Sequence, residues 1–170
     1  GKDLDEARSA EAKQKLANTL LEQATATKAD ATAQFVLLNL VKDLAIAAED
    51  IELAQQAIDL QSERYAVEPV AAKYDALNEI NRHARNVKSR AALVPVANQL
   101  VDAAIERADF ALALRLNKFV QQAATKARDR ETMKSTLARD KAIKELQRQQ
   151  ETAIVAVEKV KADPKDAQAN

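Results

Sequence analysis

The feature that most constrains this chain is the absence of glycine from every position but the first. Of its 170 residues only Gly1 is a glycine, so no interior residue adopts positive φ freely. Tight β-hairpin turns and bulges depend on glycine, whereas connections between helices can be closed by Asp, Asn and Ser caps. The rest of the composition, dominated by alanine, leucine and long polar residues with only 3% aromatics, favours helices. We therefore predict an all-α fold.

The same composition argues against the common catalytic motifs. Phosphate-binding P-loops, dinucleotide-binding turns and nucleophile elbows all require interior glycines. The chain has no cysteine, which excludes disulfides, thiolate zinc sites and iron–sulfur clusters. We expect a protein that is not an enzyme and that uses no cofactor and no metal.

The single histidine, His83, does not change that expectation. A metal site around it would draw its other ligands from carboxylates alone, which is a poor set for zinc. Its position near the predicted end of a helix is typical of an exposed residue, since positive charge is favourable there. Most of the acidic residues fall at predicted caps and on solvated helix faces.

Caps, helix breakers and the 3.6-residue periodicity predict seven helical segments. The first spans about 4–26, the second begins after the cap Asp30, the third begins after the cap Asp50, and the fourth begins at Glu68-Pro69 and continues to about Arg85. The fifth leads through Pro95 to Arg107, the sixth follows the cap Asp109, and the seventh runs from after Asp129 to Ala162. Pro95 fits if its helix begins within four residues upstream and otherwise bends the segment. The second segment is apolar on nearly every side, so we expect it to be the most buried. The last segment would be about 50 Å long if it is unbroken.

An internal repeat is visible when the chain is aligned with itself at a spacing of 59 residues. The sixteen columns from Asn39 to Ala54 contain seven identities. The matched pairs are Asn39 with Asn98, Asp43 with Asp102, Ala45 with Ala104, Ile46 with Ile105, Asp50 with Asp109, Leu53 with Leu112 and Ala54 with Ala113. Two turns and two caps coincide in this alignment, which composition alone does not produce.

The two aligned turns resemble the turn of a tetratricopeptide repeat. Residues 48–54 read Ala-Glu-Asp-Ile-Glu-Leu-Ala and residues 107–113 read Arg-Ala-Asp-Phe-Ala-Leu-Ala, and the tail at 163–170 is similar to the link into a following repeat. Glu49 and Ala108 replace the turn glycine of that family, and Asn117 stands where a large apolar residue is usual.

The resemblance, shared with uncharacterised bacterial domains of this class, implies antiparallel helical hairpins stacked as a short α/α superhelix. It implies one domain over residues 1–162, followed by a tail, 163–170, that leads to a further repeat or domain. It also implies a protein-binding scaffold and names no partner.

Charge is unevenly distributed along the chain. Residues 1–80 hold 15 acids and 8 bases, whereas residues 81–170 hold 11 acids and 18 bases. The densest basic stretch contains Arg82, Arg85, Lys88 and Arg90 and could bind phosphate or an acidic segment of a partner. It could equally be a solvated helix end. Nucleic-acid binding is disfavoured by the zero net charge and the scarcity of aromatic residues.

The repeated polar pairs give a second set of candidate binding residues. Asn39 and Asp43, like Asn98 and Asp102, lie four residues apart and so share one helical face. They could line a groove that binds a peptide, or they could form structural hydrogen bonds between helices.

These observations predict a non-enzymatic scaffold for protein–protein interaction, part of a larger protein. Two alternatives stay open: an enzyme or ligand-binding bundle with a polar pocket that no motif reveals, and a structural protein that self-associates. No stretch of sequence is long and apolar enough for a membrane span. Gly1 is typical of a residue left by tag cleavage, so an extracytoplasmic location with a trimmed leader remains open.

Overall fold

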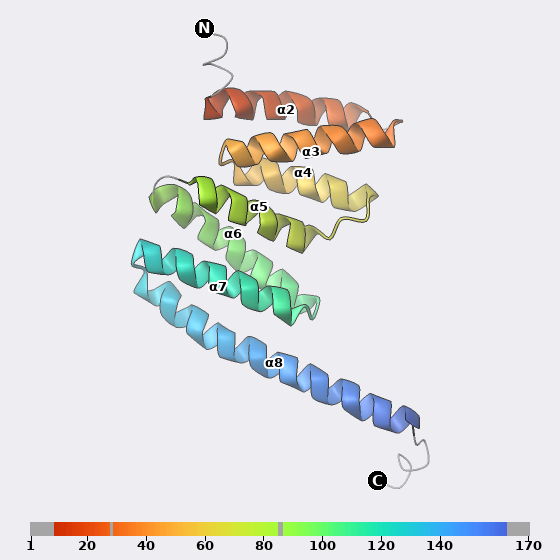
Figure 1. The fold of residues 1–170 in the computed structure, drawn as a ribbon, viewed down its shortest axis with the longest axis vertical. Helices are drawn as coiled ribbons and strands as arrows, with labels where there is room; N and C mark the ends of the chain where they lie inside the picture. The colour runs from red at the N-terminus through yellow and green to blue at the C-terminus, as the bar shows by residue number, and fades with distance from the viewer. Residues whose placement is uncertain (1–8, 28, 85–86, 163–170) are drawn as a thin grey trace. The chain divides into compact units, whose positions relative to one another are not determined.

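A computed structural model describes residues 9–27, 29–84 and 87–162, and these residues form seven α-helices and no strand (Figure 1). The helices are α2 (Ala10–Ala26), α3 (Ala31–Ala47), α4 (Ile51–Arg64), α5 (Pro69–His83), α6 (Val87–Glu106), α7 (Phe110–Ala127) and α8 (Arg130–Ala162). The all-α prediction and the long last helix are confirmed. The predicted tail at 163–170 lies outside the described residues.

Contacts divide the chain into two compact units, Gly1–Leu100 and Val101–Asn170, with the boundary inside α6. In the first unit α2 packs on α3, α3 on α4, and α4 on α5. In the second unit α7 and α8 form a hairpin. None of the helices in the described ranges combines the length and apolarity that a membrane span requires.

The predicted caps begin the helices as expected. The carboxylate of Asp30 accepts a hydrogen bond from Ala33 N at 2.9 Å, and that of Asp50 accepts one from Leu53 N at 3.0 Å. Asp109 caps α7 in the same way, and Glu68 caps α5, where Pro69 occupies the first turn. Each of these bonds satisfies a backbone N–H that has no partner within its own helix.

Asp129 occupies the corresponding position before α8. The Thr132 hydroxyl donates to one carboxylate oxygen at 2.6 Å, and the Thr132 backbone N–H donates to the other at 3.0 Å. These hydrogen bonds, the hydroxyl first, hold the pKa of Asp129 below its ordinary value.

Three turns adopt left-handed backbone without glycine. Glu49, Ala108 and Arg128 have φ values of 58°, 56° and 58°. In each turn the next residue, an aspartate, donates its backbone N–H to the carbonyl five residues earlier at 2.9 Å, as Asp50 does to Ala45. This is the Schellman geometry that usually selects glycine. The prediction that helix connections would form without glycine is confirmed, but the backbone still adopts the conformation that glycine favours.

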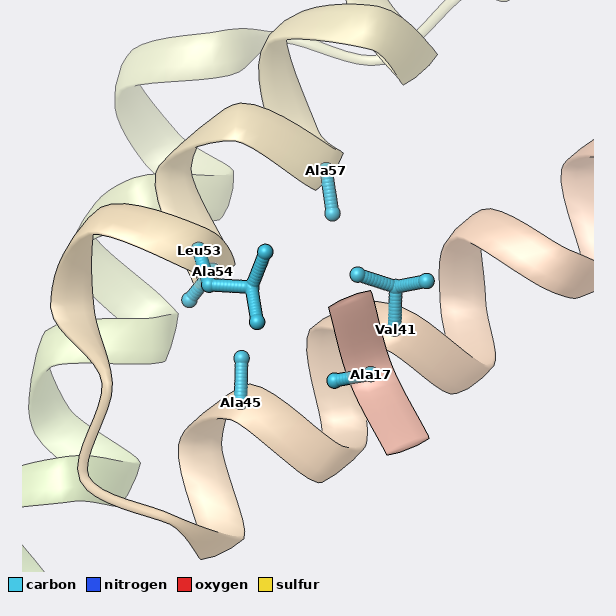
Figure 2. Close-up of a cluster of buried hydrophobic side chains, with 6 residues drawn as sticks. All are labelled: Ala17, Val41, Ala45, Leu53, Ala54 and Ala57. Atoms are coloured by element: carbon cyan, nitrogen blue, oxygen red, sulfur yellow. The ribbon is translucent and has the colours of Figure 1, made fainter. Parts of the chain in front are cut away.

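Small side chains allow the first three helices to approach closely. Figure 2 shows the contact between α2, α3 and α4, which is built from four alanines, one valine and one leucine, all at most 4% exposed. They are Ala17, Val41, Ala45, Leu53, Ala54 and Ala57. Because alanine has no side-chain rotamers to restrict, this close packing costs little conformational entropy.

The expectation that the second helix would be the most buried is wrong. In α3, Val36 is 52% and Leu40 47% exposed, and only four of its residues are buried. In α7, nine residues are buried: Phe110, Leu112, Ala113, Leu116, Asn117, Phe119, Val120, Ala123 and Ala124. A helix that packs against neighbours on part of its circumference leaves the remaining apolar residues at the surface, whatever its mean hydropathy.

The two halves of the long helix α8 differ in burial. Its first half packs on α7, and Ile143 is fully buried there. From Glu151 to Lys161 every residue is exposed, including Ile154, Val157 and Val160, each at least 50% exposed.

Candidate functional site

A pocket of about 1050 Å³ lies on the first unit. Side chains of α2, α3, α5 and the start of α6 line it, together with the turn before α4. We name it the charged pocket after its ionisable lining residues, which are Lys13, Asp43, Glu49, Glu79, Arg82, His83 and Arg90.

Both signs of charge are present around this pocket. Apart from His83, three of its ionisable residues are acidic and three are basic. Arg82 forms an ion pair with Glu79 of the same helix. The side chains of Arg82 and Asp43 are 70% and 69% exposed, so the pocket is open to solvent.

Arg90 is the least satisfied of these side chains. Its Nε atom is buried and has no hydrogen-bond partner among the residues that the structure describes. A buried donor without a partner is unfavourable, and a ligand acceptor in the charged pocket would relieve that cost.

A second pocket, of about 400 Å³, adjoins the first, and the two share Asp43, Ile46 and Glu79. We call it the α3/α5 pocket, although α4 also contributes to its lining. Its other lining residues include Phe35, Asn39, Lys42, Gln61, Val67, Ala72, Asp75 and Ala76. We call these two adjoining pockets of the first unit the groove.

The structure brings four of the predicted binding residues to this groove. Asp43, Arg82 and Arg90 line the charged pocket, and Asn39 lines the α3/α5 pocket beside Asp43. The Oδ1 atom of Asn39 accepts a hydrogen bond from Lys42 Nζ at 3.1 Å, within the same helix.

Among the described residues, the other predicted binding residues line neither pocket. Lys88 is exposed on the first turn of α6 and does not line either pocket, while Arg85 lies outside the described residues. Asn98 is half-buried on α6. Asp102 belongs to the second unit, where its carboxylate lies 3.9 Å from Arg139 of α8.

Sequence reasoning selected Asp43 and missed the two other acids of the charged pocket, Glu49 and Glu79. The stretch after Glu79 looked purely basic because no acid follows it until Asp102. The fold brings Asp43 and Glu49, which lie 39 and 33 positions before Arg82 in the chain, to the same pocket as Arg82. A pattern along the chain carries no signal for such a contact.

It also missed the buried glutamine of the α3/α5 pocket. Gln61 is 3% exposed, and no residue in the described part of the chain pairs with its Nε2 atom. The residue falls three positions after Ile58 on α4, and both are buried. The 3.6-residue periodicity is the only signal that could have indicated its burial.

No group of three or more His, Asp or Glu side chains within the described ranges could hold a metal ion. Comparison of the chain with protein families, curated proteins and solved structures finds no match.

Proposed function

We propose that this chain is a non-enzymatic scaffold that binds a segment of another protein, built from tetratricopeptide-like helical hairpins. The observation that carries the proposal is the open groove on the first unit, lined by exposed side chains of both charges. Its two pockets have volumes of about 1050 and 400 Å³, which suit several residues of an extended peptide.

The exposure of the ionisable groups favours binding over catalysis. Enzymes hold reacting groups in desolvated surroundings, where electrostatic interactions are strong. Here the side chains of Asp43 and Arg82 are each about 70% exposed, and Glu79 is 44% exposed. Charges of this kind steer association and select partners of complementary pattern.

The presence of both acidic and basic lining residues also restricts which partners can bind. An entirely basic patch would attract phosphates and acidic tails in general. A pocket lined by both acids and bases repels a ligand whose charges do not complement it position by position. We therefore expect a peptide with both acidic and basic residues, recognised at defined positions.

Selection from a random peptide library displayed on phage tests the proposal. The full chain is the bait, and the double variant Asp43→Ala/Arg82→Ala is the counter-selection bait, since both side chains are exposed and their removal should leave the fold intact. We expect selected peptides to bind the wild type with dissociation constants on the order of micromolar and the variant about tenfold more weakly. A selection that enriches no peptide, or only peptides that bind both baits equally, would contradict the proposal.

A further inference from the structure

We propose that the C-terminal half of α8 binds the same segment of a second copy of this chain, as an antiparallel pair of helices. The inference goes beyond the proposed function, since it concerns the second unit alone and does not involve the groove. Four features of the helix carry it: an exposed apolar stripe, the continuity of that stripe with the contact between α7 and α8, its heptad spacing, and the position of the charged residues.

The apolar stripe lies along one side of α8, where residues recur mostly at intervals of three or four positions and so share a helix face. We call it the α8 stripe, and its members are Leu146, Gln150, Ala153, Ile154, Val157 and Val160. The four large apolar members are between 39 and 53% exposed. A contiguous apolar surface of this kind is typical of a site of association.

The α8 stripe continues the surface with which α8 already packs on α7. Thr136 and Ile143 of that surface are 2% and 0% exposed. Ile154 follows Ile143 by eleven residues, which is close to three full turns, so the two lie on the same side of the helix. With 33 residues against 18, α8 extends about 22 Å beyond the length of α7. The same face is therefore covered in its first half and exposed from Glu151 onward.

The spacing within the stripe is that of a coiled coil. Leu146, Gln150, Ala153, Val157 and Val160 alternate at intervals of four and three residues, as the a and d positions of successive heptads do. Such a pattern fits a second helix of the same spacing, which an identical chain supplies. Antiparallel pairing of a with d positions places Leu146 opposite Val157 and Gln150 opposite Ala153. Large apolar side chains then meet each other, and the amide faces a small residue beside which it can reach solvent.

The charges of this segment do not oppose contact between two identical copies. None of the six stripe members is charged, and Glu145, Arg148 and Lys159 lie on the opposite side of the helix. Two of these are paired within the helix, since Arg148 donates to Glu145 at 2.9 Å, and Gln149 donates to the same carboxylate at 3.0 Å. Two stripes can therefore meet without burying a charge or bringing like charges together.

The position of α7 favours the antiparallel orientation. Because α7 packs on the first half of α8, a parallel pair would bring both α7 helices to the same end of the two stripes. An antiparallel pair separates them, with one α7 at each end, and leaves the exposed halves free to meet.

Sedimentation equilibrium of the full chain, from about 5 to about 500 µM, tests the proposal. We expect a reversible monomer–dimer equilibrium with a dissociation constant on the order of tens of micromolar, because two heptads form a short interface. Val157→Lys should weaken it about tenfold or more, since it places a charge in the stripe. Val155→Lys is the matched control: Val155 is 49% exposed against 52% for Val157, and it lies on the other side of the helix. A monomer at every concentration, or equal weakening by both variants, would overturn the proposal.

Single-cysteine variants test the orientation, since the chain has no cysteine of its own. On oxidation, Leu146→Cys mixed with Val157→Cys should give a disulfide-linked heterodimer. Leu146→Cys alone should give none, because an antiparallel pair separates its two copies by about 16 Å along the helix axis. A disulfide between two Leu146→Cys chains in preference to the mixed pair would refute antiparallel pairing.

Salt separates apolar association from association between charged surfaces. The dimer should persist in about 1 M NaCl, since apolar contacts are not screened. Dissociation by salt would mean that charged surfaces hold the copies together, and would overturn the assignment to the α8 stripe.

Discussion

Two buried glutamines of the first unit differ in the hydrogen bonding of their side-chain amides. Gln34 on α3 is 6% exposed, and its amide is fully paired: Nε2 donates to the carbonyl of Ala24 at 2.8 Å, and Oε1 accepts from Arg64 at 2.8 Å and from the Tyr65 hydroxyl at 3.3 Å. Gln61 on α4 is equally buried and has an unpartnered amide nitrogen.

The difference separates a structural polar residue from a candidate binding residue. Gln34 connects α2, α3 and the end of α4, so its desolvation is compensated within the fold. Gln61 lines a pocket whose other polar residues are exposed or half-buried, and no described group pairs with its amide nitrogen. Burial alone does not distinguish the two; hydrogen-bond pairing does.

The largest effect is expected at the paired glutamine. Gln34→Leu removes three hydrogen bonds and leaves the carbonyl of the fully buried Ala24 without this donor, so we expect a loss of about 2–3 kcal/mol in the free energy of unfolding. Urea denaturation measures it, with the exposed Gln56→Leu as a matched control. A loss no greater than that of the control would mean that the network contributes nothing to stability.

At Gln61, the unpaired glutamine, the change in the free energy of unfolding should have the opposite sign. Gln61→Met removes a buried amide with an unpartnered nitrogen and fills the same space with an apolar side chain, so we expect the free energy of unfolding to rise by about 1 kcal/mol. Thermal and urea unfolding of the apo protein measure the change. Destabilisation of similar size would show that the amide has a structural partner, such as an ordered water, and would remove the contrast with Gln34.

A smaller effect is expected at the edge of the Gln34 network. Tyr65→Phe removes a hydroxyl that donates to the Ala31 carbonyl at 2.6 Å and lies 3.3 Å from the Gln34 oxygen. We expect a loss of about 0.5–1 kcal/mol in unfolding free energy. In the double variant with Gln34→Leu, the total loss in unfolding free energy should be smaller than the sum of the two single losses, since the residues share one network. Strict additivity would mean that Tyr65 acts independently of Gln34.

The second unit contains an intermediate case, for which we expect the smallest effect. Asn117 on α7 is 3% exposed; its Nδ2 donates to the Thr136 carbonyl at 2.8 Å, and its Oδ1 is buried without a partner. Asn117→Leu removes one hydrogen bond, which costs stability, and one buried oxygen without a described partner, which restores some of it. Because the two effects oppose each other, the change in unfolding free energy should stay within about 0.5 kcal/mol. A loss above about 1.5 kcal/mol, measured against Gln122→Leu, would show that the single hydrogen bond dominates.

The helices themselves were largely predictable because their signals are local. Asp30, Asp50 and Asp109 were predicted as caps and act as caps, since a carboxylate reaches backbone N–H groups only two or three residues ahead. Burial was less predictable. Leu38 and Val41 are buried, yet Val36 and Leu40 of the same apolar helix are exposed.

The candidate site was predictable only in part. Arg82, Arg90, Asn39 and Asp43 were selected from charge and repetition, and the fold brings them to adjoining pockets. Asn98 and Asp102 were selected by the same repeat. Asp102 lies near Arg139 in the other unit instead, because matching positions in a repeat share a helix face and do not share neighbours.

The sequence by itself determined the all-helical class, the seven helices and the caps that begin them, because these depend on interactions within a few residues. Only the tertiary structure decided which polar groups lie in the interior, which of them find partners, and which acids face the basic stretch. Those outcomes depend on distances between residues far apart in the chain, as between Asp43 and Arg82, and local patterns do not encode such distances.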